Sequence, residues 1–437
     1  MDVDSTIDEI DLILNQFARF GIELGLERIS RLLAALDHPH HRVPVIHVAG
    51  SNGKGSVCAY VSSVLADAGF RVGRYISPHL VTWCERISIN GRAIAPADLN
   101  ALLLQIKDAI CLDAPSPTQF EVITAAAWLY FAQQQVDVAV MEVGLGGRLD
   151  ATNVCDRPLV SVITSISREH WQRLGPTLGD IAGEKAGILK PSCPAVIGVL
   201  PDEAQQVIQR RITDLKCPAV WVKPAQELGN GWARYPGEPM PMSPFPVTPI
   251  DYPVALLGAH QRLNSAVAIA TIQILQHQGW QISPRAIVEG MAKTQWLGRL
   301  QWISWNHYRL LVDGAHNPAA AATLRQFVDC TCPHAPIHWV MGMLSTKDHA
   351  DIFRELLRPG DRLYLVPVPD HSSAEPTQLA AIAQETCPYL HVTLGDDVIE
   401  ALNEAFRLAQ QDVEPVVLCG SLYLIGHFFE RTQRKTE

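Results

Sequence analysis

The sequence predicts an α/β protein with two domains. The larger N-terminal domain, residues 1–296, is predicted to be a doubly wound parallel sheet of P-loop type, and residues 297–437 a smaller α/β domain of Rossmann-like type. Three observations support this. The chain has 437 residues, too many for one compact core. Strand and helix signals alternate along it. The strands are nearly continuous apolar runs, typical of parallel strands covered on both faces.

The predicted elements of the N-terminal domain follow from capping and periodicity. Ser5–Asp8 has capping-box spacing, apolar residues follow at helical intervals, and Gly21 stands where a helix would end. A second amphipathic helix is predicted over Leu26–Leu36. The next elements are a strand, a helix and two further strands, over Val43–Val48, Lys54–Ala68, Val136–Val143 and Leu159–Ile166.

Two stretches interrupt this alternation. Residues 224–253 hold eight prolines and several glycines, which predicts a loop or an irregular β excursion, and helix signals resume at His260–His277. The domain boundary is placed at Thr294–Arg299, because a new alternation begins beyond it. Its predicted strands are Leu310–Ala315, Ile337–Gly342, Leu363–Val368 and Val416–Leu418.

Composition excludes several classes of protein. A hydrophobic content of 48% with 18% charged residues is typical of a packed enzyme and not of a disordered chain. The net charge of −10 argues against a nucleic-acid partner. No positive signal-peptide region and no apolar run of about 20 residues is present, so no membrane partner is expected. The ten cysteines are expected to be reduced thiols of a cytoplasmic monomer.

The strongest local motif follows the strand that ends at Val48. Its glycines let backbone N–H groups converge on phosphate oxygens at a helix N-terminus, and Lys54 reaches the β- and γ-phosphates. The first glycine precedes Gly53-Lys54 by three positions, unlike the common P-loop spacing. A glycine-rich turn with a surface lysine is the alternative. The predicted phosphate-binding residues are Gly50, Ser51, Asn52, Gly53, Lys54, Gly55 and Ser56.

This variant loop resembles the P-loop of the Mur-ligase superfamily. Further segments resemble the folylpolyglutamate synthase family, and together they cover nearly the whole chain: Ser77–Leu80, Glu142–Asn153, Gly183–Ile188 and Asp313–Pro318. The resemblance implies an ATP-dependent ligase that joins L-glutamate to dihydropteroate, to reduced folates or to both through an acyl phosphate. The residues leave open which of the two activities is present.

The resemblance implies two Mg²⁺ ions. Ser77 and Glu142 would hold the first beside the ATP phosphates, with Ser56 a further candidate ligand. His170 would bind the second, together with Lys185, which is carbamylated in this family. The alternatives are an exposed edge carboxylate for Glu142 and a surface lysine that pairs with Glu184 or Asp180. The family commonly has Asp-His where this chain has Glu169-His170, so the part played by Glu169 stays open.

The remaining site residues also come from the resemblance. Lys54, Lys185 and His316 are the predicted catalytic residues, and His316 would orient the glutamate or the nucleotide. Asn264, Arg299 and Asp313 would contact ATP. Phe120 would supply a stacking face, with a core position as its alternative. The predicted pterin-binding residues are Gly21, Ile22, Glu23, Phe120, Glu121, Leu149, Asp150 and Ala151.

Two possible metal-binding clusters and three alternative classes of protein are less well supported by the sequence. Cys330 and Cys332 lack the spacing of a zinc site. His38, His40 and His41 fall in a proline-interrupted loop and are expected to be solvated. A peptidoglycan Mur ligase carries a domain ahead of the P-loop, where only 49 residues precede Gly50 here. A P-loop switch would not need the second domain, and a silent nucleotide-binding subunit is disfavoured because every expected ligand position is filled.

Overall fold

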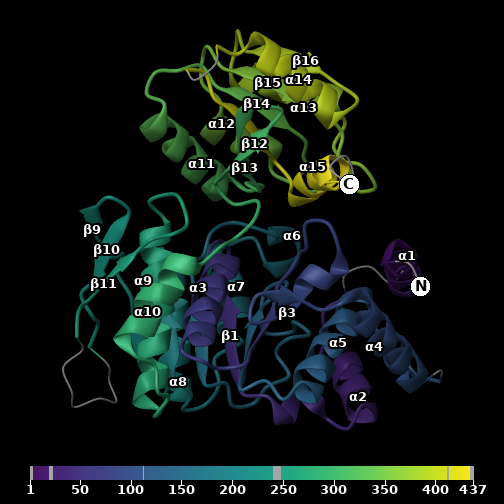
Figure 1. Ribbon diagram of the computed structural model, residues 1–437, viewed down its shortest axis with the longest axis vertical. Helices are drawn as coiled ribbons and strands as arrows, with labels where there is room; N and C mark the ends of the chain where they lie inside the picture. The colour runs from purple at the N-terminus through teal and green to yellow at the C-terminus, as the bar shows by residue number, and fades with distance from the viewer. Residues whose placement is uncertain (1–2, 19–22, 112, 240–247, 411–412, 434–437) are drawn as a thin grey trace. The chain divides into compact units, whose positions relative to one another are not determined.

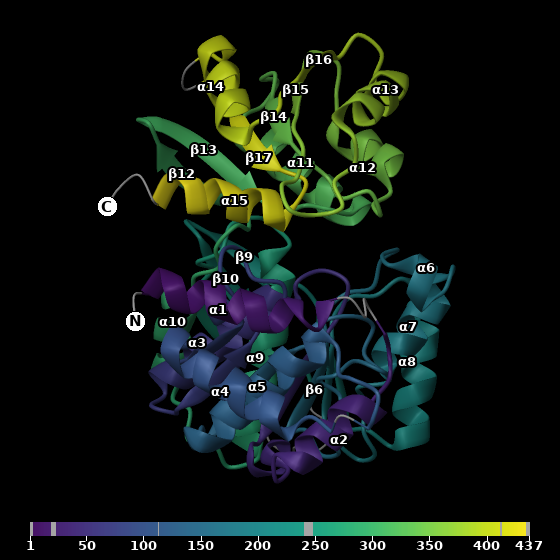
Figure 2. The ribbon, with the colours of Figure 1, turned by 90° about the vertical axis from the view of Figure 1, so that its right-hand side faces the viewer.

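The computed structural model describes residues 3–18, 23–111, 113–239, 248–410 and 413–433 (Figures 1 and 2). The chain divides into two compact units. The N-terminal unit comprises Met1–Pro78, Thr82–Ala255 and Gln261–Gln295. The C-terminal unit comprises Trp296–Glu437 and two short segments, His79–Val81 and Leu256–His260.

The N-terminal unit is built on an eight-stranded sheet of order β4-β3-β2-β5-β1-β6-β7-β8. Strands β2, β5, β1, β6, β7 and β8 are parallel to one another. Strands β3 and β4 add an antiparallel edge next to β2. Their bounds are β1 Val45–Ala49, β2 Val72–Tyr75, β3 Ile87–Ile89, β4 Arg92–Ala93, β5 Val138–Glu142, β6 Val160–Ile163, β7 Ala195–Ile197 and β8 Ala219–Trp221.

Helices cover both faces of this sheet, which confirms the doubly wound prediction (Figure 1). On one face, Val45 and Met141 pack against α2, α4 and α5, while Ile163 and Ile197 pack against α7 and α8. On the other face α3 packs against α9 and α10. The bounds are α1 Val3–Asn15, α2 Glu27–Ala35, η2 Pro39–Arg42, α3 Lys54–Asp67, η3 Trp83–Arg86, α4 Pro96–Ala109, α5 Gln119–Gln133, α6 Trp171–Leu174, α7 Leu178–Ala186, α8 Asp202–Leu215, α9 Gln261–His277 and α10 Pro284–Lys293.

The proline-rich region forms a small antiparallel sheet of order β11-β10-β9. Its strands are Gln226–Gly229, Trp232–Tyr235 and Ile250–Pro253, in the order β9, β10 and β11. This sheet fits the β excursion that the sequence offered as one of two possibilities. Residues 240–247, which hold three of the prolines, lie outside the described residues.

The C-terminal unit has a six-stranded sheet of order β12-β13-β17-β14-β15-β16, parallel except for β12. Helices α11, α12 and α13 pack on one face, and α14 and α15 on the other (Figure 2). The bounds are β12 Gln301–Trp305, β13 Tyr308–Asp313, α11 Pro318–Thr331, β14 His338–Met341, α12 His349–Leu356, β15 Arg362–Leu365, α13 Pro376–Thr386, β16 His391–Leu394, α14 Val398–Leu408, β17 Val416–Cys419 and α15 Leu422–Gln433.

Several predicted boundaries differ from the structure. The first helix already begins at Val3, so Ser5 lies inside it and is not its cap. The predicted strand over Leu159–Ile166 ends at Ile163, because the chain turns there to approach the β1 loop. All ten cysteines are free thiols. Among the described residues, no helix is both long and apolar enough to cross a bilayer.

Candidate active site

The glycine-rich loop joins the end of β1 to the start of α3. Gly50 has a φ of 150°, and a Cβ atom there would collide with the Thr164 hydroxyl. Gly53 has a φ of 85°, in the left-handed region, and immediately precedes α3. Both positions therefore require glycine, and the loop presents the helix N-terminus at the carboxyl edge of the sheet.

Lys54 is the first residue of α3 and folds back over the loop. Its Nζ atom donates to the carbonyl oxygens of Gly50 and Ser51, at 2.9 and 3.2 Å. The side chain is only partly buried. None of the ion pairs found among the described residues includes Lys54, and its ammonium group lies at the mouth of the loop.

Hydroxyl residues after β6 hold this loop in place, and the sequence analysis missed them. Thr164 and Ser165 donate to the Asn52 carbonyl oxygen at 2.7 and 3.0 Å. The Ser51 hydroxyl accepts from the Ser167 backbone N–H at 2.9 Å. The signal was three hydroxyl residues, Thr164, Ser165 and Ser167, directly after β6, the buried strand that neighbours β1.

Helix α9 contributes polar side chains to the same loop. Asn264 is buried, and its side chain lies so near Gly53 that a Cβ atom there would collide with Asn264 Oδ1. Gln261 Nε2 donates to Ser56 Oγ at 3.2 Å. The structure therefore brings Asn264 together with the loop residues, although the two segments are more than 200 positions apart.

Ser77 and Glu142 also lie together. Ser77 follows β2 and Glu142 ends β5, and these two strands are paired. The Ser77 backbone N–H lies 3.4 Å from Glu142 Oε2. Glu142 on β5 is also the sheet partner of Val48 on β1, two residues before Gly50. The Ser77 and Glu142 side chains therefore lie at the edge of the sheet that carries the glycine-rich loop.

Lys185 forms a buried ion pair that the sequence did not predict. Its Nζ atom donates to Glu169 Oε1 at 2.8 Å and to the Gly50 carbonyl at 2.9 Å. The two partners considered from the sequence are engaged elsewhere: Glu184 pairs with Arg148 at 2.8 Å, and Asp180 accepts hydrogen bonds from Thr177. Lys185 points inward from α7 and meets the loop, so the surface-lysine alternative is wrong.

Electrostatics at this ion pair act in opposite directions on its two members. Burial raises the pKa of Glu169, but Lys185, Lys54 and His170 outweigh it and hold that pKa well below its usual range. Burial lowers the pKa of Lys185, and Glu169 opposes that shift. His170 is exposed, has a φ of 47° and precedes α6.

The predicted pterin-binding residues partly converge. Arg28 forms ion pairs with Glu23 at 3.1 Å and with the buried Glu121 at 3.0 Å. The Gly25 backbone N–H donates to the Leu149 carbonyl oxygen at 3.3 Å, which brings the two predicted segments together. Ala151 is buried in the adjacent core. Gly21 and Ile22 lie outside the described residues.

Phe120 lies against the loop that follows β5. A Cβ atom at Gly144 would collide with the Phe120 ring, and the ring is only partly buried. Glu121 Oε2 accepts from Arg28 Nε and the Thr118 backbone N–H, whereas its Oε1 atom is buried and has no hydrogen-bond partner among the described residues.

Asp150 is turned inward. Its carboxylate accepts from the Leu145 backbone N–H at 2.8 Å and from the Thr152 hydroxyl at 2.5 Å. Since that hydroxyl donates to Asp150, the Nε2–H of buried His47 must donate to it, at 2.8 Å. Burial raises the pKa of Asp150. The carboxylate organises its own loop, and its predicted pterin contact stays a prediction.

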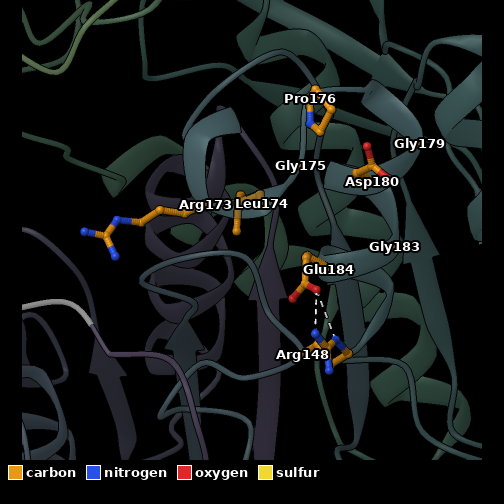
Figure 3. A pocket seen from close by; sticks show the side chains of 9 residues that line it. All are labelled: Arg148, Arg173, Leu174, Gly175, Pro176, Gly179, Asp180, Gly183 and Glu184. Carbon is orange, nitrogen blue, oxygen red and sulfur yellow. Dashed lines mark hydrogen bonds and ion pairs between the residues drawn. The ribbon is translucent and has the colours of Figure 1, made fainter.

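An open pocket of about 620 Å³ lies beside α6 and α7 (Figure 3). In Figure 3 the Arg148 and Glu184 side chains point toward each other and Arg173 extends away from them. No predicted site residue lines this pocket. The lining residues are Arg148, Arg173, Leu174, Gly175, Pro176, Gly179, Asp180, Gly183 and Glu184.

Three predicted residues lie in the C-terminal unit. Asp313 ends β13, and its carboxylate accepts from the Leu300 and Ala315 backbone N–H groups at 2.8 and 2.9 Å. Burial raises the pKa of Asp313. Arg299 donates to the Gly314 carbonyl oxygen at 3.2 Å, and His316 Nδ1 lies 2.8 Å from the same oxygen, so that nitrogen carries a proton. The three side chains thus surround one loop.

Comparisons with known proteins agree with this arrangement. Residues 48–272 match the Mur ligase middle domain, and residues 297–431 match the C-terminal domain of dihydrofolate synthetase. The dihydrofolate synthase/folylpolyglutamate synthase of Bacillus subtilis is 35% identical over 419 residues, which cover 94% of this chain and 96% of that protein. The chain belongs to the dihydrofolate synthase/folylpolyglutamate synthase family of Mur ligases. It is therefore an ATP-dependent, amide-forming ligase.

Other members of the family resemble the whole chain. The dihydrofolate synthase/folylpolyglutamate synthase of Escherichia coli is 34% identical over 94% of this chain and 91% of its own length. The structure of E. coli FolC with DHPP and ADP has a TM-score of 0.84, with 29% identity, over 100% of this chain and 99% of that one. Mycobacterium tuberculosis folylpolyglutamate synthase complexed with ADP has a TM-score of 0.86, with 31% identity, over 99% of both chains.

Proposed function

We propose that this ligase joins L-glutamate to dihydropteroate, to the terminal glutamate of reduced folates, or to both. The observation that carries the proposal is the convergence of Lys54 and Lys185 on the Gly50 carbonyl, next to the Ser77–Glu142 pair. The Lys54 ammonium and an oxygen-donor pair at the mouth of a phosphate-binding loop suit phosphoryl transfer to a carboxylate, and Lys185 stands at the same loop as an amine that can be modified. The names of the relatives supply the substrates.

In the proposed reaction a carboxylate oxygen of the folate substrate attacks the γ-phosphorus of ATP, and ADP leaves. The acyl phosphate is then attacked at its carbonyl carbon by the neutral amine of glutamate. Phosphate leaves, the nitrogen loses a proton and an amide remains. Lys54 stabilises the negative charge on the transferred phosphoryl group. Arg299, Asp313 and His316 are proposed to contact nucleotide and glutamate from the C-terminal unit.

The donors beside the loop fit the two Mg²⁺ ions that the family implies. Glu142 is a buried carboxylate and Ser77 and Ser56 are hydroxyls, which are hard oxygen ligands. We propose that these residues hold the first ion and that His170 and Lys185 hold the second. Bound Mg²⁺ would neutralise phosphate charge. A Yersinia pestis member of the family has been solved with AMPPNP and Mn ion.

For Lys185 to bind a cation, its charge must change. Its burial and its lowered pKa favour the neutral amine, which adds CO₂ to give an anionic carbamate. This carbamate would replace the present donation to Glu169, because both groups would then be anions. We therefore propose that Lys185 has two states. The carbamylated side chain faces the metal, and the unmodified side chain pairs with Glu169.

The carbamate is testable with protein equilibrated in ¹³C-bicarbonate. We expect a carbamate carbon resonance that is absent from Lys185→Ala and Lys185→Arg. Lys185→Ala should be inactive and partly rescued by acetate, whereas Lys185→Arg should not be rescued, because its guanidinium stays charged. A wild-type spectrum without the resonance in active, metal-loaded enzyme would contradict this part of the proposal.

The pterin ring is proposed to stack on Phe120, with its aminopyrimidine edge near Glu121. The buried, unpartnered Oε1 atom of Glu121 supports this, since such an acceptor gains most from a donor on a ligand. Glu23, Leu149, Asp150 and Ala151, with Gly21 and Ile22, would complete the surroundings of the ring. A Gly144→Ala change should raise KM for the pteroate more than it lowers kcat, because it displaces Phe120.

The substrate assignment is tested by phosphate release from ATP with dihydropteroate and with tetrahydrofolate, each with and without glutamate. We expect glutamate-dependent turnover with both, and none in the Lys54→Ala control. Turnover with UDP-sugar peptides and not with pteroates would overturn the assignment. We further propose that the functional domains are 1–296 and 297–437 and that the enzyme is a cytoplasmic monomer. We also propose that it has no nucleic-acid partner, because a net charge of −10 disfavours binding to a polyanion.

A further inference from the structure

Three histidines gather at the opposite end of β1 from the glycine-rich loop. His38, His40 and His41 each offer a ring nitrogen, and these three nitrogens all lie within 4.8 Å of one another. Among the described residues this is the one cluster of metal-ligating side chains of this kind. The sequence predicted that all three would be solvated, but His40 is only 7% exposed, because it packs against α5.

The local backbone explains why the rings meet. Asp37 and His38 both adopt left-handed conformations, with φ of 61° and 49°, and Pro39 starts the 3₁₀ turn η2. The His41 backbone N–H donates to the His38 carbonyl oxygen at 3.1 Å. Residues three apart eclipse in such a turn, and the His38 and His41 rings are accordingly stacked, 5.1 Å apart with 2° between their planes.

His40 provides the independent observation that points to a ligand. Its Nδ1 atom is buried and has no hydrogen-bond partner among the described residues. Its ring lies 4.1 Å from that of His41, between centroids, and 6.3 Å from that of the buried Trp128. Burial and the two neighbouring rings lower the pKa of His40 to about 4, so its imidazole is neutral and has a lone pair at pH 7.

We propose that His38, His40 and His41 form a Zn²⁺-binding site, separate from the Mg²⁺ sites. Imidazole nitrogens suit Zn²⁺ and other late transition metals, whereas Mg²⁺ prefers oxygen ligands. Tetrahedral Zn²⁺ with bonds of about 2.0–2.1 Å needs nitrogens roughly 3.4 Å apart. Rotation of the two exposed rings, His38 and His41, supplies the small closure required.

The surroundings tolerate the added positive charge. Arg42, the nearest cation in the turn, is paired with Asp37 at 3.4 Å. The Asp156 carboxylate lies near enough to act on His40 electrostatically and supplies a counter-charge. The five residues of β1 separate the cluster from Gly50 by about 16 Å, so a bound ion would stabilise the packing of η2 on α5 without joining the ligase reaction.

The test uses the full-length protein, stripped of metal with a chelator and then kept in excess Mg²⁺ to occupy the oxygen sites. We expect calorimetry to detect one Zn²⁺ per chain. Co²⁺ in its place should give the visible bands of tetrahedral nitrogen coordination without a thiolate charge-transfer band. The exposed variants His38→Ala and His41→Ala should fold normally, keep ligase activity, and each weaken Zn²⁺ binding more than about tenfold.

Two further variants assign the ion. His277→Ala removes an exposed histidine at the end of α9 and should bind Zn²⁺ like wild type. His170→Ala should also retain the binding, because the ion does not depend on the ligase site. Unchanged affinity in a His38→Ala/His41→Ala double variant, or loss of binding in His170→Ala alone, would overturn the proposal.

Discussion

Among the described residues, each unit contains one ion pair in which both side chains are at most 9% exposed, and the two pairs differ in their surroundings. In the N-terminal unit Lys185 Nζ lies 2.8 Å from Glu169 Oε1, with side-chain exposures of 2% and 9%. In the C-terminal unit Arg325 Nη1 lies 2.7 Å from Asp361 Oδ2, with exposures of 9% and 2%. Distance and burial alone therefore do not show whether a buried ion pair supports the fold or the proposed reaction.

The partners beyond the pair make the distinction. Asp361 also accepts from the Ile337 and Arg358 backbone N–H groups and from Trp339 Nε1, at 3.1, 3.0 and 3.0 Å. It thus ties together the start of β14, the start of β15 and α11. Lys185 and Glu169 instead join α7 to the glycine-rich loop through the Gly50 carbonyl. The Arg325–Asp361 pair connects elements of the C-terminal fold, whereas the Lys185–Glu169 pair lies beside the glycine-rich loop that is proposed to bind phosphate.

The largest expected effect comes from replacing the Lys185–Glu169 pair. Lys185→Met with Glu169→Gln should abolish ligase turnover, while the free energy of unfolding stays within about 1 kcal/mol of wild type or rises, because a buried ion pair replaced as a whole is often neutral for stability. Turnover assays and urea unfolding measure the two quantities. A large loss of stability would mean that this pair is structural, like that of Asp361.

Lys54→Ala tests the same comparison with a cation that has no ion-pair partner among the described residues. Loss of transition-state charge stabilisation should lower kcat by roughly 10²–10⁴ and leave unfolding nearly unchanged, since Lys54 only donates to two loop carbonyls. Steady-state kinetics at saturating ATP provide the measurement, with the exposed Lys293→Ala as control. Near wild-type turnover would show that Lys54 does not face the phosphates.

Asp361→Ala should have the opposite profile. It leaves Arg325 without its most buried partner and removes acceptors from three further donors, which should lower the free energy of unfolding by about 3–5 kcal/mol. At a temperature where the variant remains folded, kcat should match wild type. A stable variant with a low kcat would contradict the structural assignment.

The smallest expected effect is the contribution of buried His47 to the pH dependence of the free energy of unfolding. Burial, with Lys190, lowers the pKa of His47 from 6.5 to about 3. The unfolded chain therefore binds a proton that the folded protein does not, and stability falls as pH decreases from about 6.5 toward 3, by up to about 1.4 kcal/mol per pH unit. Glu169 adds to this loss only below about pH 4.5, its unfolded pKa, because the unfolded chain then takes up a proton that the folded carboxylate, with its depressed pKa, does not bind.

His47→Gln isolates this contribution, because glutamine can also donate to Thr152 but does not titrate. Urea unfolding between pH 7 and pH 4 should show a shallower loss of stability in the variant than in wild type. Parallel pH profiles would mean that His47 is not a source of acid sensitivity.

Local signals account for the parts of the fold and site that the sequence predicted. The apolar runs of β1, β5, β6 and β13, and the turn chemistry of Gly50 and Gly53, depend on neighbours within a few residues, so periodicity and spacing identify them. Strands β4 and β7 were not predicted because they are only two and three residues long, and β16 was not predicted because its side chains are mostly exposed and form no apolar run. The roles of the site residues still stand as proposals.

The sequence by itself determined the chain's alternation of strands and helices, its glycine-rich loop and its family. The tertiary structure decided which residues are in contact and which are buried. Lys185 pairs with Glu169 and not with Glu184, Asn264 contacts Gly53, and His40 is buried. These contacts depend on which way a side chain points once a helix has packed on a sheet, and helical spacing leaves that direction open until the packing is complete. The difference arises because periodicity is a property of neighbouring residues, whereas desolvation and pairing depend on segments distant in the chain.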